Sequence, residues 1–265
     1  MKMTAWILPL ALGLEMALAD ILVTGATGRT GSALYNALKA TQPEPVRALV
    51  RNATKARDVL GCKKCDASEG IFEGDVTQIS TLSAAFHGVT RLAIAVGVYG
   101  TESEKIVKEV EWLGVKNQVE SLLRDGAGGR HVLLISSIGT TTPPESNSSK
   151  VLFYKLLAES YIASAGVPFS IIKPCGLADA PGGDRSFLLS HDDADFSKWM
   201  SEGTIMIPRA DVAAVAAEAM IREPASTMRF DLCAKAAGTG PPQPLQAVLK
   251  AALYPWQRSE RSMLV

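Results

Sequence analysis

The amino-acid sequence predicts an α/β protein built on a doubly wound parallel sheet, with a small extension at its C-terminal end. Short apolar runs, typical of strands buried on both faces, alternate with helical patterns along most of the chain. The first of these runs leads into a turn with three evenly spaced glycines. The length of 265 residues, 47% of them hydrophobic, is enough for one large domain with its own core.

The spacing of apolar residues places the individual elements. Strands are expected at 21–23, 46–50, 71–72, 92–96, 131–137, 169–174 and 228–232. Helices are expected at 30–40, 104–124, 152–165, 211–222 and 245–253. Because helices separate most of the strands, the sheet is expected to be parallel and covered on both faces.

The chain divides into three parts. Residues 1–19 form a candidate signal or targeting leader, residues 20–240 form the main domain, and residues 241–265 add a linker and a C-terminal helix. Between residues 176 and 206 the pattern loosens into a loop-rich insertion. We expect this insertion to lie over the carboxyl edge of the sheet, where a ligand would bind.

The N-terminus has the outline of a removable leader. Lys2 precedes an apolar run at 5–14, and Ala17 and Ala19 form an A-x-A end just before the first strand. Glu15 interrupts the apolar stretch, which is too short for a transmembrane span. A signal peptide, a leader for an organelle such as the plastid, and a retained amphipathic helix all stay open. A retained leader would leave the protein in the cytoplasm.

Charge and cysteine content exclude several classes of function. Lys plus Arg equals Asp plus Glu at 27 each, which argues against nucleic acid or an anionic membrane as the main partner. Four scattered cysteines predict no disulfide framework. Cys62 and Cys65 form a C-K-K-C pair that fits a redox couple, half of a zinc site, or a loop with two free thiols. We expect the loop and no metal, because no histidine lies at ligand spacing to the pair.

The glycine-rich stretch reads V-T-G-A-T-G-R-T-G and joins a strand to a helix. The free N–H groups at a helix N-terminus attract a pyrophosphate. Gly25 permits the tight turn, Gly28 lets the backbone approach the phosphates, and Gly31 lets the helix pack closely. The sequence therefore predicts a dinucleotide site at this turn.

The T-G-A-T-G-R-T-G spacing resembles the short-chain dehydrogenase/reductase superfamily, and in particular its atypical, NmrA-like members, which include plant NAD(P)-binding proteins. The runs VRALVRN, GDVT, WLGVKNQ, KLLAESYIASAGVPFSIIKPCGL and IPRADVA carry the resemblance over essentially the whole chain from Asp20. It implies a Rossmann fold, a nicotinamide cofactor, and a substrate pocket formed by the 176–206 insertion.

The second strand indicates which cofactor is bound. An NAD site usually ends this strand with an acidic residue, whereas here Arg51 stands at that position and Arg29 lies inside the glycine turn. Two guanidinium groups suit a 2′-phosphate, so we expect NADPH rather than NADH, the alternative being two solvated arginines. Asp75 resembles the family aspartate that binds the adenine amino group. The expected cofactor-binding residues are Gly25, Thr27, Gly28, Arg29, Thr30, Gly31, Arg51, Asp75 and Lys155.

The resemblance implies a Ser–Tyr–Lys relay, of which two members are present. Ser137 and Lys155 match the serine and lysine positions, but Val151 stands where the tyrosine belongs. Tyr154 points about 100° away from Lys155 on a helix, so it is not expected to replace that tyrosine. The chain is then either a reductase whose substrate, small and conjugated or carbonyl-bearing, needs no such phenol, or a dinucleotide-binding sensor or docking protein.

Three acid–base residues lie in the insertion, namely His191, Asp192 and Asp193. We interpret them as solvated loop residues rather than catalytic acids. The expected partner is a small-molecule substrate, and the protein is expected to be a monomer or a homodimer.

Overall fold

The computed structural model describes residues 20–43, 45–99, 101–124, 126, 128–141, 149–222 and 226–261. The candidate leader, residues 1–19, lies outside these ranges. Within them, no helix is both long enough and apolar enough to cross a bilayer.

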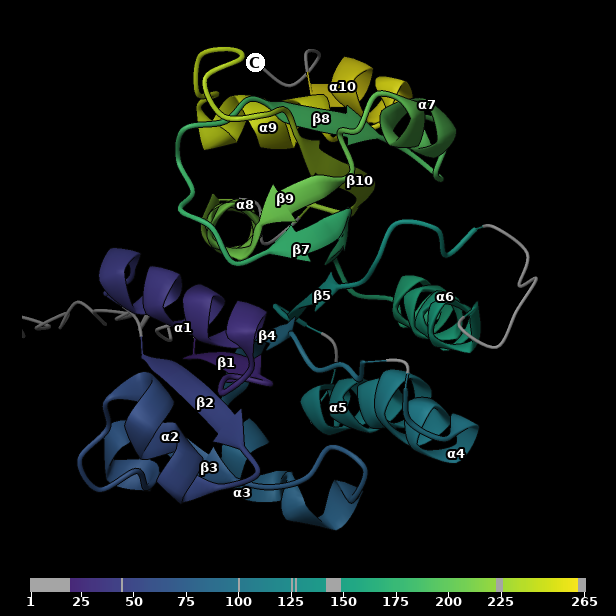
Figure 1. Cartoon of the computed structure of the whole chain (residues 1–265). Coiled ribbons are helices and arrows are strands. Elements are labelled where there is room, and N and C mark those ends of the chain that lie inside the picture. The colour runs from purple at the N-terminus through teal and green to yellow at the C-terminus, as the bar shows by residue number, and fades with distance from the viewer. Residues whose placement is uncertain are drawn as a thin grey trace, which may run out of the picture.

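An eight-stranded sheet forms the centre of the molecule, in the order β3-β2-β1-β4-β5-β6-β10-β8 (Figure 1). All neighbours are parallel except β8, which runs antiparallel to β10. The strands are β1 (Asp20–Thr24), β2 (Val46–Val50), β3 (Ile71–Glu73), β4 (Val89–Ile94), β5 (His131–Ile135), β6 (Phe169–Pro174), β8 (Phe187–Ser190) and β10 (Met228–Ala234). The strand order reverses between β1 and β4, which is where doubly wound sheets bind their ligands.

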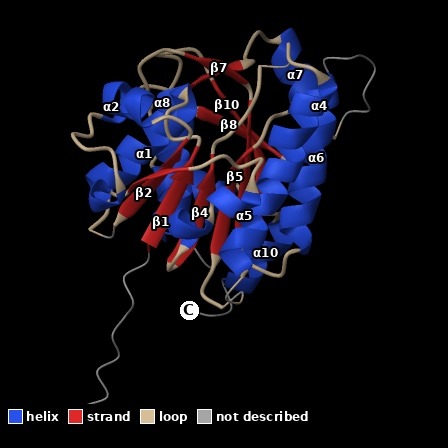
Figure 2. Ribbon diagram, turned by 90° about the horizontal axis from the view of Figure 1, so that it is seen from below, coloured by secondary structure: helices blue, strands red, loops and turns tan. Residues whose placement is uncertain are grey.

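Helices cover both faces of the sheet (Figure 2). The α-helices are α1 (Arg29–Thr41), α2 (Ala53–Leu60), α3 (Ser83–Phe86), α4 (Glu104–Val107), α5 (Gly114–Leu123), α6 (Ser149–Ser164), α7 (Phe196–Ser201), α8 (Arg209–Arg222), α9 (Leu245–Ala251) and α10 (Pro255–Arg261). Short 3₁₀ turns are η1 (Ala67–Glu69) and η2 (Ile79–Thr81), and η3 (Lys108–Leu113) is a π-helix. These elements confirm the α/β, doubly wound architecture expected from the sequence, although the antiparallel edge strand β8 was not expected.

Two apolar clusters fill the space between the sheet and its helices. One lies against α1 and α8 and includes Leu34, Val215 and Phe230. The other lies against α5 and α6 and includes Leu92 and Ile171. Side chains of successive strand residues point to opposite faces, so each strand contributes to both clusters.

Several element boundaries differ from those expected. The helix expected at 104–124 is interrupted by the π-helix η3, which separates α4 from α5. The 176–206 insertion carries β7 (Gly176–Ala178), which pairs with β9 (Met206–Pro208) in a small second sheet, together with β8 and α7. Helix α2 was not expected, because its sequence ATKARDVL buries only Ala56 and has no apolar stripe.

The expectation of free thiols is wrong. The structure joins Cys62 to Cys65 and Cys175 to Cys233, and it contains no free cysteine among the four. The second pair links residues 58 apart in sequence, because β6 and β10 are neighbours in the sheet. Spacing along the chain could not reveal this pair, because only the sheet order brings the two strands together.

Candidate cofactor and catalytic site

The glycine turn, residues 25–31, connects β1 to α1 and is closed by tight backbone contacts. Gly25 has φ +68°, a left-handed conformation that favours glycine. A Cβ on Gly31 would lie 2.1 Å from the carbonyl oxygen of Gly25, so no larger residue fits there. A Cβ on Gly28 would meet only that same oxygen, at 3.1 Å, and otherwise open space. Two glycines are thus required by the fold itself, whereas Gly28 leaves room for a ligand.

The N-terminus of α1 is suited to a phosphate. Gly28 is the N-cap and supplies no side-chain hydrogen bond, and no acidic residue lies in the first turn. The first N–H groups of a helix without a cap are free to bind an anion, which the helix dipole also favours. These observations fit a dinucleotide pyrophosphate. Thr27 and Thr30 flank the same backbone and are half-buried.

The two arginines expected at the 2′-phosphate lie in different environments. Arg29 forms an ion pair with Asp179, at 2.9 Å, and its guanidinium lies 5.7 Å from the ring centroid of Tyr99. Asp179 also pairs with Arg209 at the start of α8, at 2.6 Å. Arg51, at the end of β2, is exposed. Asp179 was missed by the sequence analysis, and it connects the 176–206 segment to the glycine turn.

Asp75, the residue expected to bind the adenine, lies in the loop after β3. Its Oδ1 accepts hydrogen bonds from the backbone N–H and the hydroxyl of Thr77, at 2.9 and 2.8 Å. The backbone N–H of Asp75 donates to Thr81 Oγ1. These bonds fix the carboxylate in a turn and leave its second oxygen available.

Lys155 projects from α6 and is held by a buried carboxylate. Its Nζ lies 2.8 Å from Glu111 Oε2, and the side chains are 13% and 2% exposed. The other oxygen, Glu111 Oε1, accepts the backbone N–H of Val98, in the loop after β4, at 2.9 Å. Glu111 belongs to the π-helix η3, a feature that often occurs at functional sites. The sequence analysis missed Glu111, and only the interruption of a long helix could have signalled it.

Tyr154 is directed elsewhere than Lys155, as the helix geometry predicts. Its hydroxyl donates to Glu104 Oε1 at 3.2 Å, while Lys155 contacts Glu111 two turns further along. Burial, followed by the hydrogen bond to Glu104, raises the pKa of Tyr154. Because its hydroxyl is bonded to Glu104 and Lys155 is bonded to Glu111, Tyr154 is not placed to exchange a proton beside Lys155.

Ser137 follows β5 and donates its hydroxyl to the carbonyl of Ile138, at 2.9 Å. Among the described residues, no hydrogen bond joins Ser137 to Lys155. The preceding residue, Ser136, is buried and donates to Glu159 on α6. The two serines therefore differ in role: one is tied into the core beneath α6, and the other lies half-buried at the edge of the sheet.

A group of buried charges supports the loop that carries Ser137. Lys173 on β6 is fully buried, with its Nζ 2.9 Å from Asp193 Oδ1 and 3.2 Å from Asp231 Oδ1. Asp193 also accepts the backbone N–H groups of Gly139 and Thr141, both at 2.8 Å. We call these three charged residues together with Glu159, Asp192 and Arg229 the ionic cluster.

The interpretation of the insertion acids as solvated loop residues is therefore wrong for Asp193. Its side chain is 5% exposed and lies in the centre of the ionic cluster. Hydrogen bonds from Thr141, Lys173 and Gly139 outweigh burial and lower its pKa, so it is a carboxylate and not an acid catalyst. The sequence could not show this, because its partners come from β6, β10 and the loop after β5.

His191 and Asp192 also have defined partners. Asp192 pairs with Arg229 and accepts the hydroxyl of Tyr254, and Arg229 in turn pairs with Glu159 at 2.8 Å. The ring of His191 stacks on Tyr254 with 4.0 Å between centroids, and its Nδ1 lies 2.9 Å from the Arg229 carbonyl oxygen. These contacts attach the C-terminal segment to the sheet, which is a structural role.

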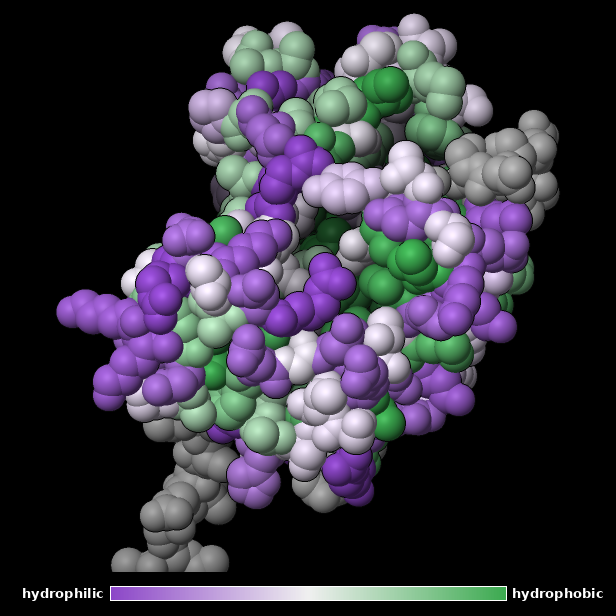
Figure 3. All heavy atoms as spheres, turned by 60° about the horizontal axis from the view of Figure 1, so that its bottom comes forward, coloured by the Kyte–Doolittle hydropathy of each residue, from purple (hydrophilic) through white to green (hydrophobic). Residues whose placement is uncertain are grey.

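The face shown in Figure 3 is hollowed between two lobes, with hydrophobic side chains inside and hydrophilic ones around the rim. The 176–206 segment, α8 and the chain near Leu245 line a further cavity of about 360 Å³. Asp211 lies in its wall, accepts the Gly183 N–H at 2.6 Å, and has a pKa raised by burial. A Cβ on Gly182 would lie 2.4 Å from Asp211 Oδ1, so this loop packs directly on α8.

Comparison with known proteins supports the assignment suggested by this geometry. A family model described as NAD(P)H-binding matches residues 25–223. The chain is 32% identical over 244 residues to an uncharacterized chloroplastic protein of Arabidopsis thaliana, covering 84% of this chain and 71% of that protein. It is 28% identical over 259 residues to sanguinarine reductase of Eschscholzia californica, covering 83% of this chain and 90% of the enzyme.

Solved structures share the fold at low identity. An oxidoreductase of Lactococcus lactis superposes with a TM-score of 0.64 at 15% identity, covering 89% of this chain and 99% of that one. A short-chain dehydrogenase/reductase of Veillonella parvula in complex with NADP gives 0.58 at 13% identity, covering 85% and 97%. With the family match over residues 25–223 and the Arabidopsis relative, this chain belongs to the NAD(P)H-binding family, within the atypical short-chain dehydrogenase/reductase group.

Proposed function

We propose that this protein is an NADPH-dependent reductase of a small conjugated or carbonyl substrate. The observation that carries the proposal is the buried pair of Lys155 and Glu111, on the same carboxyl edge of the sheet as the glycine turn. A lysine held this way is more than a surface charge, because its partner is almost fully buried. The similarity to sanguinarine reductase supports reduction as the reaction type.

The bound cofactor would supply a hydride, and the chain's own residues would bind and orient it. The glycine turn and α1 would hold the pyrophosphate, Arg51 and Arg29 the 2′-phosphate, and Asp75 the adenine. Asp179 already pairs with Arg29, so a 2′-phosphate would join or displace that ion pair. Lys155 would bind the ribose hydroxyls beside the nicotinamide, with Glu111 positioning its Nζ.

The missing phenol limits which substrates suit this site. With Val151 at the tyrosine position and Tyr154 bonded to Glu104, no tyrosine hydroxyl among the described residues forms a hydrogen bond with Lys155. A substrate that takes up a hydride at carbon and needs no proton at the same step fits these residues, as does one that obtains its proton from Ser137 or from water. A cationic, conjugated ring system meets the first condition, because hydride addition neutralises it.

A turnover screen tests the proposal. NADPH oxidation would be followed by the loss of absorbance of the reduced nicotinamide ring, with quinones, flavins, tetrapyrroles and sanguinarine as acceptors. We expect at least one acceptor to be reduced with NADPH at a higher kcat/KM than with NADH. Tight NADPH binding without turnover on any acceptor would favour the second candidate, a dinucleotide-binding sensor or docking protein, for which the loss of the tyrosine is the supporting observation.

Variants of the buried pair separate a role in cofactor placement from a role in folding. Lys155→Met should weaken NADPH binding about tenfold, because a charge-assisted contact to a ribose hydroxyl is lost. Glu111→Gln keeps the size and the Val98 contact but releases Lys155, so it should raise KM for NADPH more than it lowers kcat. The exposed Lys105→Ala is the matched control. An unchanged NADPH affinity in Lys155→Met would show that this lysine is an ordinary helix residue with no part in cofactor binding.

We propose a plastid as the location of the mature protein. The leader outline at residues 1–19 and the chloroplastic description of the Arabidopsis relative support this. Mass spectrometry of the native protein would show a start near Asp20. An intact Met1 in the native protein would contradict the proposal.

A further inference from the structure

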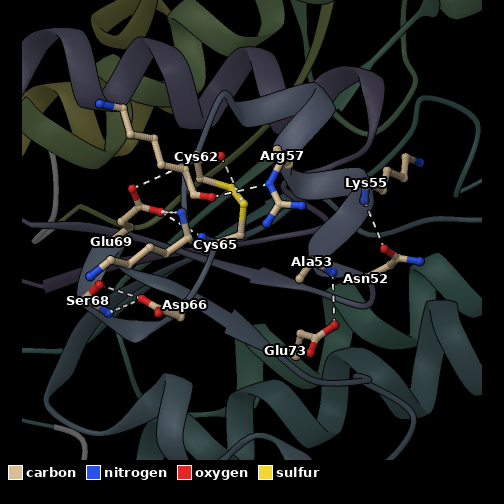
Figure 4. The surroundings of a disulfide bond; sticks show 12 residues. Asn52, Ala53, Lys55, Arg57, Cys62, Cys65, Asp66, Ser68, Glu69 and Glu73 are labelled. Carbon is tan, nitrogen blue, oxygen red and sulfur yellow. Dashed lines mark hydrogen bonds between the residues drawn. A yellow bond between two sulfur atoms is a disulfide. The ribbon is translucent and has the colours of Figure 1, made fainter.

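The C-K-K-C turn directly follows α2, and Figure 4 shows its disulfide with the side chains around it. Helix α2 ends at Gly61, which has φ +69° and whose N–H donates to the Arg57 carbonyl. The chain then reverses through the four residues of the motif, which brings the Cα atoms of Cys62 and Cys65 to 5.1 Å. This spacing is within the range of an ordinary disulfide, so the turn can hold either two thiols or one bond.

The two sulfurs of this pair differ in access. Cys65 is 5% exposed and belongs to the apolar cluster against α1, whereas Cys62 is half-buried at its edge. The two residues between them, Lys63 and Lys64, are exposed. A thiolate from solution can therefore approach the Cys62 sulfur, while the Cys65 sulfur is covered by the protein.

The turn keeps its shape through a carboxylate and not only through the disulfide. Glu69 accepts three consecutive backbone N–H groups, those of Lys63, Lys64 and Cys65, at 3.2, 2.8 and 2.7 Å. These bonds, the one from Cys65 first, lower the pKa of Glu69, so it is ionised at neutral pH. Cys65 itself has φ +57°, a left-handed conformation that this network maintains. After reduction the thiols would stay adjacent and could close again.

The second disulfide provides an internal contrast. Cys175 and Cys233 are 4% and 0% exposed, and they join the residue after β6 to β10 across 58 residues of sequence. Closing so long a loop constrains the unfolded chain strongly, whereas a bond between residues three apart constrains it little. The Cys62–Cys65 bond is thus the less useful for stability and the more accessible for chemistry.

We propose that Cys62 and Cys65 form a reversible thiol–disulfide exchange site that is reduced by a dithiol protein. A thiolate of the partner attacks Cys62 Sγ, which forms a mixed disulfide and releases Cys65 as a thiolate. The partner's second thiolate then attacks the partner's first sulfur, which is bonded to Cys62 in the mixed disulfide. This closes the partner's disulfide and releases Cys62 as a thiolate. Two electrons pass from the dithiol to this pair, the partner becomes a disulfide, and the protons of its thiols end on Cys62 and Cys65.

Selective reduction of the folded full chain tests access. The protein would be incubated with dithiothreitol, quenched with acid, and alkylated for peptide mass spectrometry. We expect the Cys62–Cys65 peptide to be reduced at least tenfold faster than the Cys175–Cys233 pair, with the circular dichroism spectrum unchanged. Reduction of both pairs at one rate, or none at Cys62 and Cys65 before unfolding, would overturn the proposal.

A trapping experiment tests the direction of attack and the class of reductant. A thioredoxin that lacks its resolving cysteine should form a mixed disulfide that maps to Cys62, and the Cys62→Ser chain should give none. Glutathione, a monothiol, should reduce the pair more slowly than an equal concentration of dithiothreitol, because Cys65 expels it from the mixed disulfide. An adduct at Cys65, or reduction by glutathione as fast as by dithiothreitol, would count against a dithiol partner.

Glu69 and the two sulfurs also lie within 4.8 Å of one another, close enough to share a cation once reduced. Elemental analysis of the purified protein decides between the two chemistries. We expect no stoichiometric zinc and no slowing of reoxidation when zinc is added. One zinc per chain, released together with the two thiols by an oxidant, would assign the pair to a metal and overturn exchange.

Discussion

The glycine turn takes its structure mainly from one short stretch of chain, with one long-range contact between Gly25 and the backbone of Ala95 after β4, whereas the ionic cluster assembles residues from β6, β10, α6 and the insertion. In the turn, the carbonyl of Gly25 alone excludes a side chain at Gly31. In the cluster, Lys173 depends on Asp193 and Asp231, which are distant in sequence. A local structure is encoded by residue types at fixed spacing, whereas a long-range cluster exists only when the sheet has formed.

The largest change in stability is expected from a substitution in the ionic cluster. Lys173→Met keeps most of the side-chain volume but leaves two buried carboxylates without their cation. Removing one partner of a buried ion pair lowers the free energy of unfolding by about 3–5 kcal/mol. Urea unfolding measures this, with the exposed Lys105→Ala as control and Lys173→Met/Asp231→Asn as partial rescue. A loss below about 1 kcal/mol would mean that Lys173 is not the cation on which the two carboxylates depend.

A substitution at Gly28 in the glycine turn should weaken NADPH binding without unfolding the protein. Gly28→Val places a branched side chain where the phosphates would lie, so NADPH affinity should fall at least a hundredfold, about 2.7 kcal/mol, while the circular dichroism spectrum is retained. Gly128→Val is the matched control, because a Cβ there meets nothing within 4 Å. Retained NADPH binding by Gly28→Val would place the phosphate site elsewhere.

The pH dependence of stability tests His131, a buried group for which, unlike Lys173, the described residues supply no carboxylate partner. Burial, and to a lesser degree Arg91, lowers the pKa of His131 to about 4. In the unfolded chain His131 has a pKa of about 6.5, so between pH 6.5 and pH 4 it is protonated there but stays neutral in the folded protein. The free energy of unfolding therefore falls as pH drops from 6.5 towards 4. Between pH 7 and pH 5 the loss is about 2 kcal/mol.

The control for this pH effect is His131→Gln, which keeps a polar group near Ser170 but does not titrate there. Urea unfolding of both chains at pH 7 and pH 5 should show a smaller acid loss in the variant, by about the same 2 kcal/mol. Equal losses in the two chains would show that other groups dominate in this range.

The smallest effect is expected at the edge of the cofactor region. Arg51→Ala should weaken NADPH binding about tenfold, about 1.4 kcal/mol, and leave NADH binding unchanged, because only the 2′-phosphate contact is lost. Arg57→Ala, on the exposed side of α2, is the control. Protein fluorescence titration with both cofactors measures the ratio, and equal losses for NADPH and NADH would reject a 2′-phosphate contact.

Particular residues show how far sequence reasoning reached. The core strands and the glycine turn were predicted, because apolar runs and glycine spacing are local signals. Glu111 was missed because a π-helix does not change the apolar pattern enough to be seen. Asp193 was misinterpreted because a loop acid and a buried carboxylate have the same appearance in sequence. The cofactor and catalytic roles assigned to Ser137, Lys155, Arg51 and Asp75 stay predictions.

The sequence by itself determined the parallel sheet, the dinucleotide turn, the family, and the loss of the tyrosine at Val151. Each of these depends on residues close together in the chain, whose geometry follows from short-range sterics and periodicity. Tertiary structure alone decided that Glu111 holds Lys155, that Lys173 lies between two carboxylates, and that Cys175 pairs with Cys233. Those contacts join distant segments, and their energies arise only after the sheet excludes water from between them.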